Sequence, residues 1–275
     1  GRRARSELPN VFDAKYKRIF GYRRLTAAKA FRGDIGIPRA LNMYENYPFW
    51  FTVLTKLGFR VLISGRSSRD LLERGMDSIA SENICYPAKL THGHIEDLIS
   101  RGVKTIFYPS IAYEQTQIAA ADNQFNCPVV MSYPEVITHN VTSLREQNVR
   151  LVRPFLTLSN IPYLVRGLVE AFADWEIDEA EMTEAVNAGL AEDAAFRADV
   201  RQMGKDALAY MAEHGVNGIV LAGRPYHLDP EINHGVPDLV NSLGMAVLTE
   251  DCLLDPPASV LERPLRVRDQ WAYHS

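Results

Sequence analysis

The chain has 275 residues and a mass of 30.9 kDa, which is long enough for two domains with substantial cores. Apolar residues make up 47% and charged residues 23%, and the net charge of −4 argues against a general nucleic-acid-binding protein. No apolar run is long enough for a membrane span, and no secretory signal opens the chain. Three cysteines do not make a disulfide scaffold, so we expect a cytoplasmic protein.

Charge is distributed unevenly along the chain. Residues 1–40 hold eleven Lys/Arg against three Asp/Glu, and residues 170–200 hold ten Asp/Glu against one Arg. One interpretation is a basic linker and a solvated helix face. The other is a pair of complementary docking surfaces, within the chain or toward a partner.

Residues 1–34 are interpreted as a basic entry arm, followed from Ile35 by short apolar strands that alternate with helical patterns. This alternation predicts a parallel sheet covered on both faces, a Rossmann-like α/β lobe over residues 35–158. Strands are expected at 35–40, 59–64, 103–108, 128–133 and 149–158. Helices are expected from Pro48 to Leu57, from a Ser67–Ser68 cap through Met76, and from Pro87 to Arg101.

Residues 159–214 are expected to form a helical connector, with helices at 161–175 and 178–214 and a break near Gly189. The α/β alternation then restarts over residues 215–275, with strands at 216–222 and 245–249 and a helix at 234–243. Two strands and one helix cannot form a stable sheet alone. We therefore expect an α/β fold with two Rossmann-like lobes, the second one truncated.

All three cysteines are predicted in loops at the ends of elements, where α/β proteins build their sites. Cys85 comes just before a helix that Pro87 would open, and free N–H groups there favour a thiolate. Cys127 is expected before a strand and Cys252 after one. None resembles a core thiol, although an inert buried thiol is the commoner role of a single cysteine. Their spacings match no zinc motif.

Two further groups of polar residues are candidate site residues. His92 and His94 lie two positions apart in a predicted helix, so at most one should face a site, and hydrogen-bonded structural histidines are the alternative. Gly93 between them indicates the close approach of another chain segment. The loop at 223–235 follows a strand directly, and it carries Arg224, Tyr226, His227, Glu231 and His234. It is either a ligand-binding loop or a long hydrogen-bonded turn.

Two long motifs carry a resemblance to a known family. They are Glu-Asn-Ile-Cys-Tyr-Pro-Ala-Lys-Leu at 82–90 with His-Gly-His at 92–94, and Ala-Gly-Arg-Pro-Tyr-His at 222–227 with Asp-Pro-Glu-Ile-Asn-His-Gly at 229–235. Together they resemble the uncharacterised DUF2229 domain of proteins related to the 2-hydroxyacyl-CoA dehydratase activator. The resemblance runs from about residue 8 to the end of the chain. Wider relatives are the dehydratase subunits and the double-cubane cluster proteins.

The resemblance implies an iron–sulfur cluster held between two lobes, of the [4Fe–4S] or double-cubane type. Cys85, Cys127 and Cys252 would then be its ligands, with Lys89, His92 and His94 behind them. Arg224, Tyr226, His227, Glu231 and His234 would line the substrate pocket. Thiolates suit such clusters.

The function implied is low-potential electron transfer or reductive chemistry, driven by ATP-dependent activase modules in the same chain or another. The chain has no P-loop and no Gly-x-Gly-x-x-Gly motif after its first strand, so it should not hydrolyse ATP itself. One alternative is a module that binds a CoA ester or an anionic metabolite without redox chemistry. Another is a scaffold between activase and dehydratase modules. Whether the chain is itself an enzyme stays open.

Overall fold

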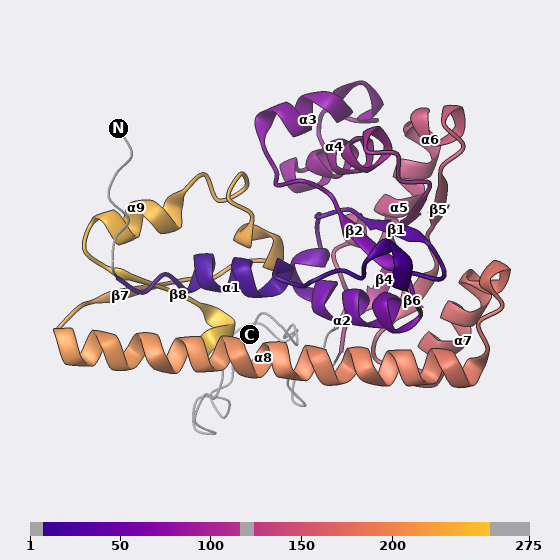
Figure 1. The fold of residues 1–275 in the computed structure, drawn as a ribbon. Coiled ribbons are helices and arrows are strands. Elements are labelled where there is room, and N and C mark those ends of the chain that lie inside the picture. Colours follow the sequence, from indigo (N-terminus) through magenta and orange to yellow (C-terminus); the bar gives the residue numbers. More distant parts are fainter. Residues whose placement is uncertain (1–7, 116–123, 254–275) are drawn as a thin grey trace.

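A computed structural model describes residues 8–115 and 124–253 (Figure 1). Its largest sheet has four parallel strands in the order β2-β1-β3-β5, and these are β1 (Asp34–Ile37), β2 (Arg60–Ile63), β3 (Thr105–Phe107) and β5 (Arg150–Val152). β1 pairs with β2 in register from Asp34 opposite Arg60 to Ile37 opposite Ile63. The prediction of an α/β fold with parallel strands is confirmed.

Two smaller parallel sheets accompany the first one. β4 (Ser110–Tyr113) pairs with β6 (Phe155–Thr157), and β7 (Gly218–Leu221) pairs with β8 (Ala246–Thr249). The single strand expected at 149–158 is therefore two strands in different sheets, β5 and β6. Pro154 lies between them, and the strands part there because proline supplies no N–H to a ladder.

Helices surround these sheets, and one of them, α8, runs along the whole length of the described molecule (Figure 1). The α-helices are α1 (Val11–Phe20), α2 (Met43–Lys56), α3 (Arg69–Gly75), α4 (Tyr86–Ser100), α5 (Pro128–Asn140), α6 (Ser143–Glu146), α7 (Ile161–Ala171), α8 (Glu179–His214) and α9 (Val236–Ser242). Short 3-10 helices are η1 (Ala27–Lys29), η2 (Met76–Ser78), η3 (Ala173–Trp175), η4 (Pro225–Leu228) and η5 (Glu250–Leu253). No helix in the described ranges is long and apolar enough to cross a membrane.

The strand expected at 128–133 is wrong, because these residues begin the helix α5. The buried side chains of this segment are Val130, Tyr133, Pro134 and Ile137, which is the spacing of one helix face. The short run Val129-Val130-Met131 looks like a strand by itself, but Pro128 at the first turn is a helix-start signal. The fourth strand in chain order is β4.

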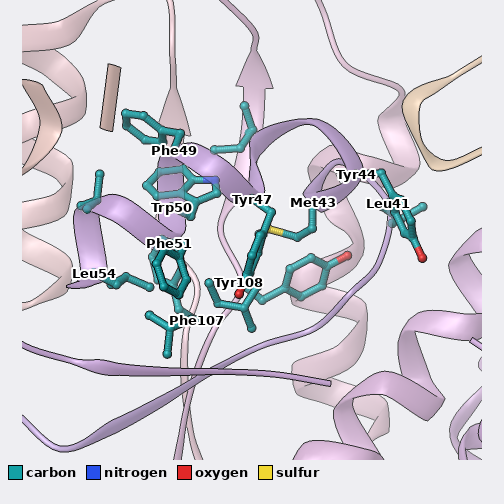
Figure 2. Close-up of a cluster of buried hydrophobic side chains, with 14 of the residues drawn as sticks. Leu41, Met43, Tyr44, Tyr47, Phe49, Trp50, Phe51, Leu54, Phe107 and Tyr108 are labelled. Atoms are coloured by element: carbon teal, nitrogen blue, oxygen red, sulfur yellow. The ribbon is translucent and has the colours of Figure 1, made fainter. Parts of the chain in front are cut away.

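The helix α2 begins at Met43, before the predicted start at Pro48, so Pro48 lies inside the helix. The expectation that this helix is buried nearly all round is confirmed. Phe49 and Trp50 pack edge to face, and Trp50 does the same with Phe107 of β3 (Figure 2). These rings belong to one continuous hydrophobic core that extends from α1 to Cys252.

The expected break in the long helix near Gly189 is also wrong. A Cβ at Gly189 would lie 2.7 Å from Val53 Cγ2 and 2.8 Å from Phe49 Cδ2. The glycine therefore allows α2 to pack closely on an uninterrupted α8. Gly93 allows the close approach of another segment, as the sequence indicated. A Cβ at this position would lie 2.0 Å from the carbonyl oxygen of Leu71 in α3.

The basic arm and the acidic segment meet within the chain. Arg18 of α1 contacts Glu192 and Asp199 of α8, each at 2.7 Å, and Arg32 forms an ion pair with Glu181. The arm also reaches the second parallel pair, because the carbonyl of Pro9 accepts a hydrogen bond from the N–H of Val247 in β8. Of the two interpretations of the charge pattern, intramolecular docking is confirmed for these residues.

Candidate functional site

Cys85 and Cys127 occupy equivalent positions in the fold. Each is the N-cap residue of a helix, α4 or α5, and each is followed by a proline in the first turn. Cys85 is exposed and Cys127 is half-buried, and neither side chain caps its own helix. The positive end of each helix dipole therefore lies next to a thiol that is available for chemistry.

Both thiols influence the electrostatics of the same tyrosine, Tyr226. Burial raises the pKa of Tyr226, Arg224 lowers it, and the charges of Cys127 and Cys85 both raise it. Burial together with the charge of Cys85 raises the pKa of Tyr133 in α5 to about 12. Cys85 and Cys127 are thus both within electrostatic range of the Tyr226 hydroxyl.

Cys252 lies in a different environment. Its side chain belongs to the hydrophobic core with 4% exposure, and its thiol donates to the Thr249 carbonyl at 3.0 Å. Its backbone presses on α8 so closely that a Cβ at Gly204 would lie 2.2 Å from its carbonyl oxygen. Burial raises the pKa of this thiol. The expectation that Cys252 is not a core thiol is therefore wrong.

A small, partly open pocket lies between α2, the start of α5 and the loop at 223–235. It has room for about one water molecule. The 223–235 loop contributes Arg224, Pro225 and Tyr226 to its lining, and the first half of the chain contributes Asn42, Glu45, Asn126, Cys127 and Val130. The structure thus brings one predicted ligand and two predicted pocket residues together, beside residues that the sequence did not single out.

Two further residues of the 223–235 loop contact Tyr86 at the start of α4. Glu231 accepts a hydrogen bond from the Tyr86 hydroxyl at 2.9 Å, and the His234 ring lies 6.4 Å from the Tyr86 ring. His227 packs on Gly223, where a Cβ would lie 2.3 Å from its Nδ1. Burial and then Arg224 lower the pKa of His227. Glu231 and His234 are therefore neighbours of Cys85 through Tyr86.

His92 and His94 are both fully buried and point to different partners, as their spacing predicted. Ser78 donates to the Gly75 carbonyl, so it accepts from His92 Nδ1 at 2.8 Å, and His92 Nε2 accepts from the Tyr133 hydroxyl at 3.0 Å. His94 contacts Ser64 through Nδ1 and Ser67 through Nε2. Burial lowers the pKa of His92 to about 4 and that of His94 to about 3.

His92 is thus hydrogen-bonded to Tyr133, whose pKa Cys85 raises, while the partners of His94 are the two serines. Lys89 donates to the carbonyl of Glu82 at 2.8 Å and so closes the loop that precedes Cys85. Lys89 thus acts on the backbone of the loop before Cys85.

Asp229 is a residue that the sequence reasoning missed. Its carboxylate is 1% exposed and accepts hydrogen bonds from Tyr44 Oη at 2.6 Å and from Ser67 Oγ, both in the first half of the chain. The backbone N–H of Glu231 donates to its other oxygen at 2.9 Å. Asp229 therefore ties the 223–235 loop to α2 and to the start of α3. Its position within the loop motif was visible, but its partner Tyr44 was not.

A buried carboxylate group lies beneath the pocket and was also missed. Glu114 accepts from Asn46 at 3.0 Å and from Asn126 at 2.6 Å, while Asp193 pairs with Arg197 at 2.9 Å. Burial and the charge of Glu114 raise the pKa of Glu45. Glu114 follows β4, which the sequence did not predict, so its approach to α2 could not be foreseen.

Among residues 8–115 and 124–253, no group of three or more His, Cys, Asp and Glu side chains is arranged to hold a metal ion. Two of the three predicted thiols influence the electrostatics of one tyrosine, and the third is in the core. The described residues thus place two thiols at helix N-termini.

Comparison with known proteins gives one match. The family model for the CoA enzyme activase uncharacterised domain (DUF2229) matches residues 34–253. No curated protein and no solved structure matches the chain. The matched segment includes the four-stranded sheet, the two helices that have a cysteine at the N-cap position, and the 223–235 loop. The chain therefore belongs to the family of the CoA enzyme activase uncharacterised domain.

Proposed function

We propose that this domain is a cysteine-dependent redox module of an activase and dehydratase system, and that it holds an iron–sulfur cluster through Cys85 and Cys127. The observation that supports the proposal is that both residues occupy the N-cap position of a helix and influence the same tyrosine, Tyr226. The family description supports the link to an activase. ATP-dependent activase modules, in the same chain or another, would deliver the electrons.

The donor set suits such a cluster in part. Thiolates are the usual ligands of iron–sulfur clusters, and a helix N-terminus stabilises negative charge. Cys252 was expected as a third ligand, and its burial and its bond to Thr249 argue for a structural role. The remaining ligands would then come from outside the described residues. A bound cluster would supply one-electron transfer.

The surrounding side chains would control access and hydrogen bonding. The Tyr133 hydroxyl donates a hydrogen bond to His92 Nε2, so its oxygen is left as an acceptor on the side that senses Cys85. Tyr226 lies within electrostatic range of both thiols and, with Arg224, lines the pocket beside Cys127. Tyr226 and Arg224 would offer donors to a negatively charged occupant.

Anaerobic reconstitution with iron and sulfide tests this function. Wild-type protein is expected to acquire the visible charge-transfer absorption of an iron–sulfur cluster. The double variant with Cys85→Ser and Cys127→Ser should remain colourless while it keeps the circular dichroism spectrum of the wild type. Equal absorption in the two proteins would overturn the proposal.

A second candidate function is the binding of a CoA ester or an anionic metabolite without redox chemistry. Arg224 favours it, because this cation lines the same pocket as Cys127 at the N-terminus of α5. On this account a CoA ester raises the melting temperature of the wild type and of the double cysteine variant equally, and Arg224→Gln removes the effect. Stabilisation that requires the cysteines would contradict it.

A further inference from the structure

Two arginines follow neighbouring strands of the four-stranded sheet. Arg39 comes two residues after β1 and Arg66 three residues after β2, and these strands are parallel neighbours. Both arginines therefore lie at the carboxyl edge of the sheet, where open α/β sheets usually bind their ligands. The backbone N–H of Arg39 donates to Ser64 Oγ at 2.7 Å, so the two loops are in contact.

Both guanidinium groups lie against the ring of Tyr16 in α1. The Cζ atom of Arg66 is 5.1 Å from the centre of this ring, and the Cζ atom of Arg39 is 5.7 Å from it. Arg39 also lies 4.5 Å from the ring centre of Phe20, and its Nη1 donates to the Tyr16 hydroxyl at 2.6 Å. The aromatic rings thus gather two cations around one tyrosine.

Neither of these arginines forms an ion pair with a carboxylate among residues 8–115 and 124–253. Arg39 is half-buried and Arg66 is exposed. Other half-buried arginines do pair with carboxylates, as Arg18, Arg32 and Arg197 show. A cation that is partly removed from water is costly without an anion beside it, so the pair favours an anionic occupant.

The buried carboxylate of Asp229 does not neutralise the two arginines. Burial raises the pKa of Asp229 and Arg39 lowers it, so Asp229 is within electrostatic range of Arg39. However, Asp229 is 1% exposed, and its oxygens accept hydrogen bonds from Tyr44, from Ser67 and from the N–H of Glu231. It balances at most one of the two positive charges.

We infer that Arg39 and Arg66 form a binding site for a phosphate group, either as a monoester of a small molecule or as free phosphate. A phosphate monoester carries close to two negative charges at neutral pH and three acceptor oxygens. It can therefore accept from two guanidinium groups at once. A carboxylate has one charge and two oxygens, which a single arginine satisfies, so it should bind more weakly.

This site goes beyond the proposed redox function. Neither arginine lines the pocket beside Cys127, and phosphate binding needs no cluster at Cys85 and Cys127. The site can therefore be tested on protein without iron. Failure of the reconstitution experiment would not affect it, and failure of the phosphate site would leave the cysteine proposal unchanged.

Phosphorus NMR of the full chain at pH 7.5 and constant ionic strength tests the site, with methyl phosphate as the probe. The resonance of methyl phosphate is expected to broaden when wild-type protein is added. Arg66→Gln should weaken the affinity about tenfold, because it removes charge-assisted hydrogen bonds. This variant should fold, because Arg66 is exposed, and thermal unfolding checks this. Free phosphate is titrated in the same way, and the tighter probe identifies the form that the site takes.

The matched control is Arg166→Gln, which removes an equal charge from an exposed position of α7 and should bind methyl phosphate as the wild type does. Arg39→Met keeps an unbranched apolar side chain against Phe20 and should also weaken binding about tenfold. If this variant does not fold, Arg66→Gln decides the question.

Acetate serves as the carboxylate competitor and should displace methyl phosphate much less than free phosphate does. The inference is overturned if neither phosphate probe binds or if acetate competes as well as free phosphate. It is also overturned if Arg66→Gln or a folded Arg39→Met retains the affinity of the wild type, or if Arg166→Gln loses as much affinity as Arg66→Gln.

Discussion

Three cysteines look alike in the sequence, but the structure separates them by burial and by partners. Cys85 was placed correctly at a helix N-cap, because Pro87 marks the first turn of α4. Cys127 occupies the same kind of position, which the sequence does not indicate because the apolar run after it is typical of a strand. The core position of Cys252 depends on α8, which approaches from far away in the chain, so local sequence could not reveal it.

These positions predict the order in which the thiols react. Alkylation of the native protein with iodoacetamide should modify Cys85 first, because it is exposed, and Cys252 last, because it is buried and its pKa is raised. Cys127 should be intermediate. Peptide mass spectrometry over a time course measures the three rates. Modification of Cys252 as fast as Cys85 in folded protein would contradict this placement.

The buried histidines predict a pH effect on stability. The pKa of His94 is about 3 in the folded protein and about 6.5 in the unfolded chain, so the unfolded chain binds this proton first. The contribution of neutral His94 to the free energy of unfolding is fully present above pH 6.5. It is lost as the pH falls toward 3, by up to about 1.4 kcal/mol per pH unit.

Urea unfolding of the wild type and of His94→Gln at pH 7.5 and pH 5.0 measures this effect. Lowering the pH from 7.5 to 5.0 should reduce the free energy of unfolding of the wild type by about 1–2 kcal/mol more than that of the variant. The comparison with the variant is needed because buried carboxylates such as Asp229, whose pKa is raised, change stability in the opposite direction. A difference that is independent of pH would contradict the account.

At the scale of elements, close crossings between helices depend on glycine. Gly75 and Gly93 allow α3 and α4 to touch backbone to backbone, since a Cβ at Gly75 would lie 2.3 Å from the nitrogen of Gly93. This contact holds Ser78 against His92 and so supports Tyr133 near Cys85. The sequence indicated a close approach at Gly93, but it could not identify α3 as the partner.

Gly93→Ala should therefore destabilise the protein by about 1–3 kcal/mol, because its Cβ would overlap the Leu71 carbonyl. Gly65→Ala is the matched control, since its Cβ would only touch Asp97 at 3.7 Å, and its effect should be small. Chemical denaturation of both variants measures the two free energies of unfolding. Equal values would show that the helix crossing is not as tight as described.

At the scale of the whole molecule, the basic arm and α8 connect the region of the four-stranded sheet with the β7–β8 pair. α1 packs against α8 and beside β8, and the ion pairs of Arg18 and Arg32 join the basic arm to the acidic face. Composition predicted both charged segments but left open whether they meet within the chain. The fold class was predictable from alternation along the chain, whereas the distribution of strands among three sheets depends on long-range pairing.

Arg18→Ala should lower the free energy of unfolding by about 1 kcal/mol, because Arg18 contacts both Glu192 and Asp199 and is only 25% exposed. The loss should shrink in high salt, which screens such pairs. Arg145→Ala on the exposed face of α6 is the control and should have little effect. A loss in Arg18→Ala that does not depend on salt would indicate lost packing instead of lost charge pairing.

The central claim is that Cys85 and Cys127 form one site and that Cys252 is structural. The most direct measurement is the iron and acid-labile sulfide content of three single variants after anaerobic reconstitution, namely Cys85→Ser, Cys127→Ser and Cys252→Ser. We expect the first two to lose most of the bound iron and the third to retain the content of the wild type. Loss of iron in Cys252→Ser, or retention in the other two, would contradict the account.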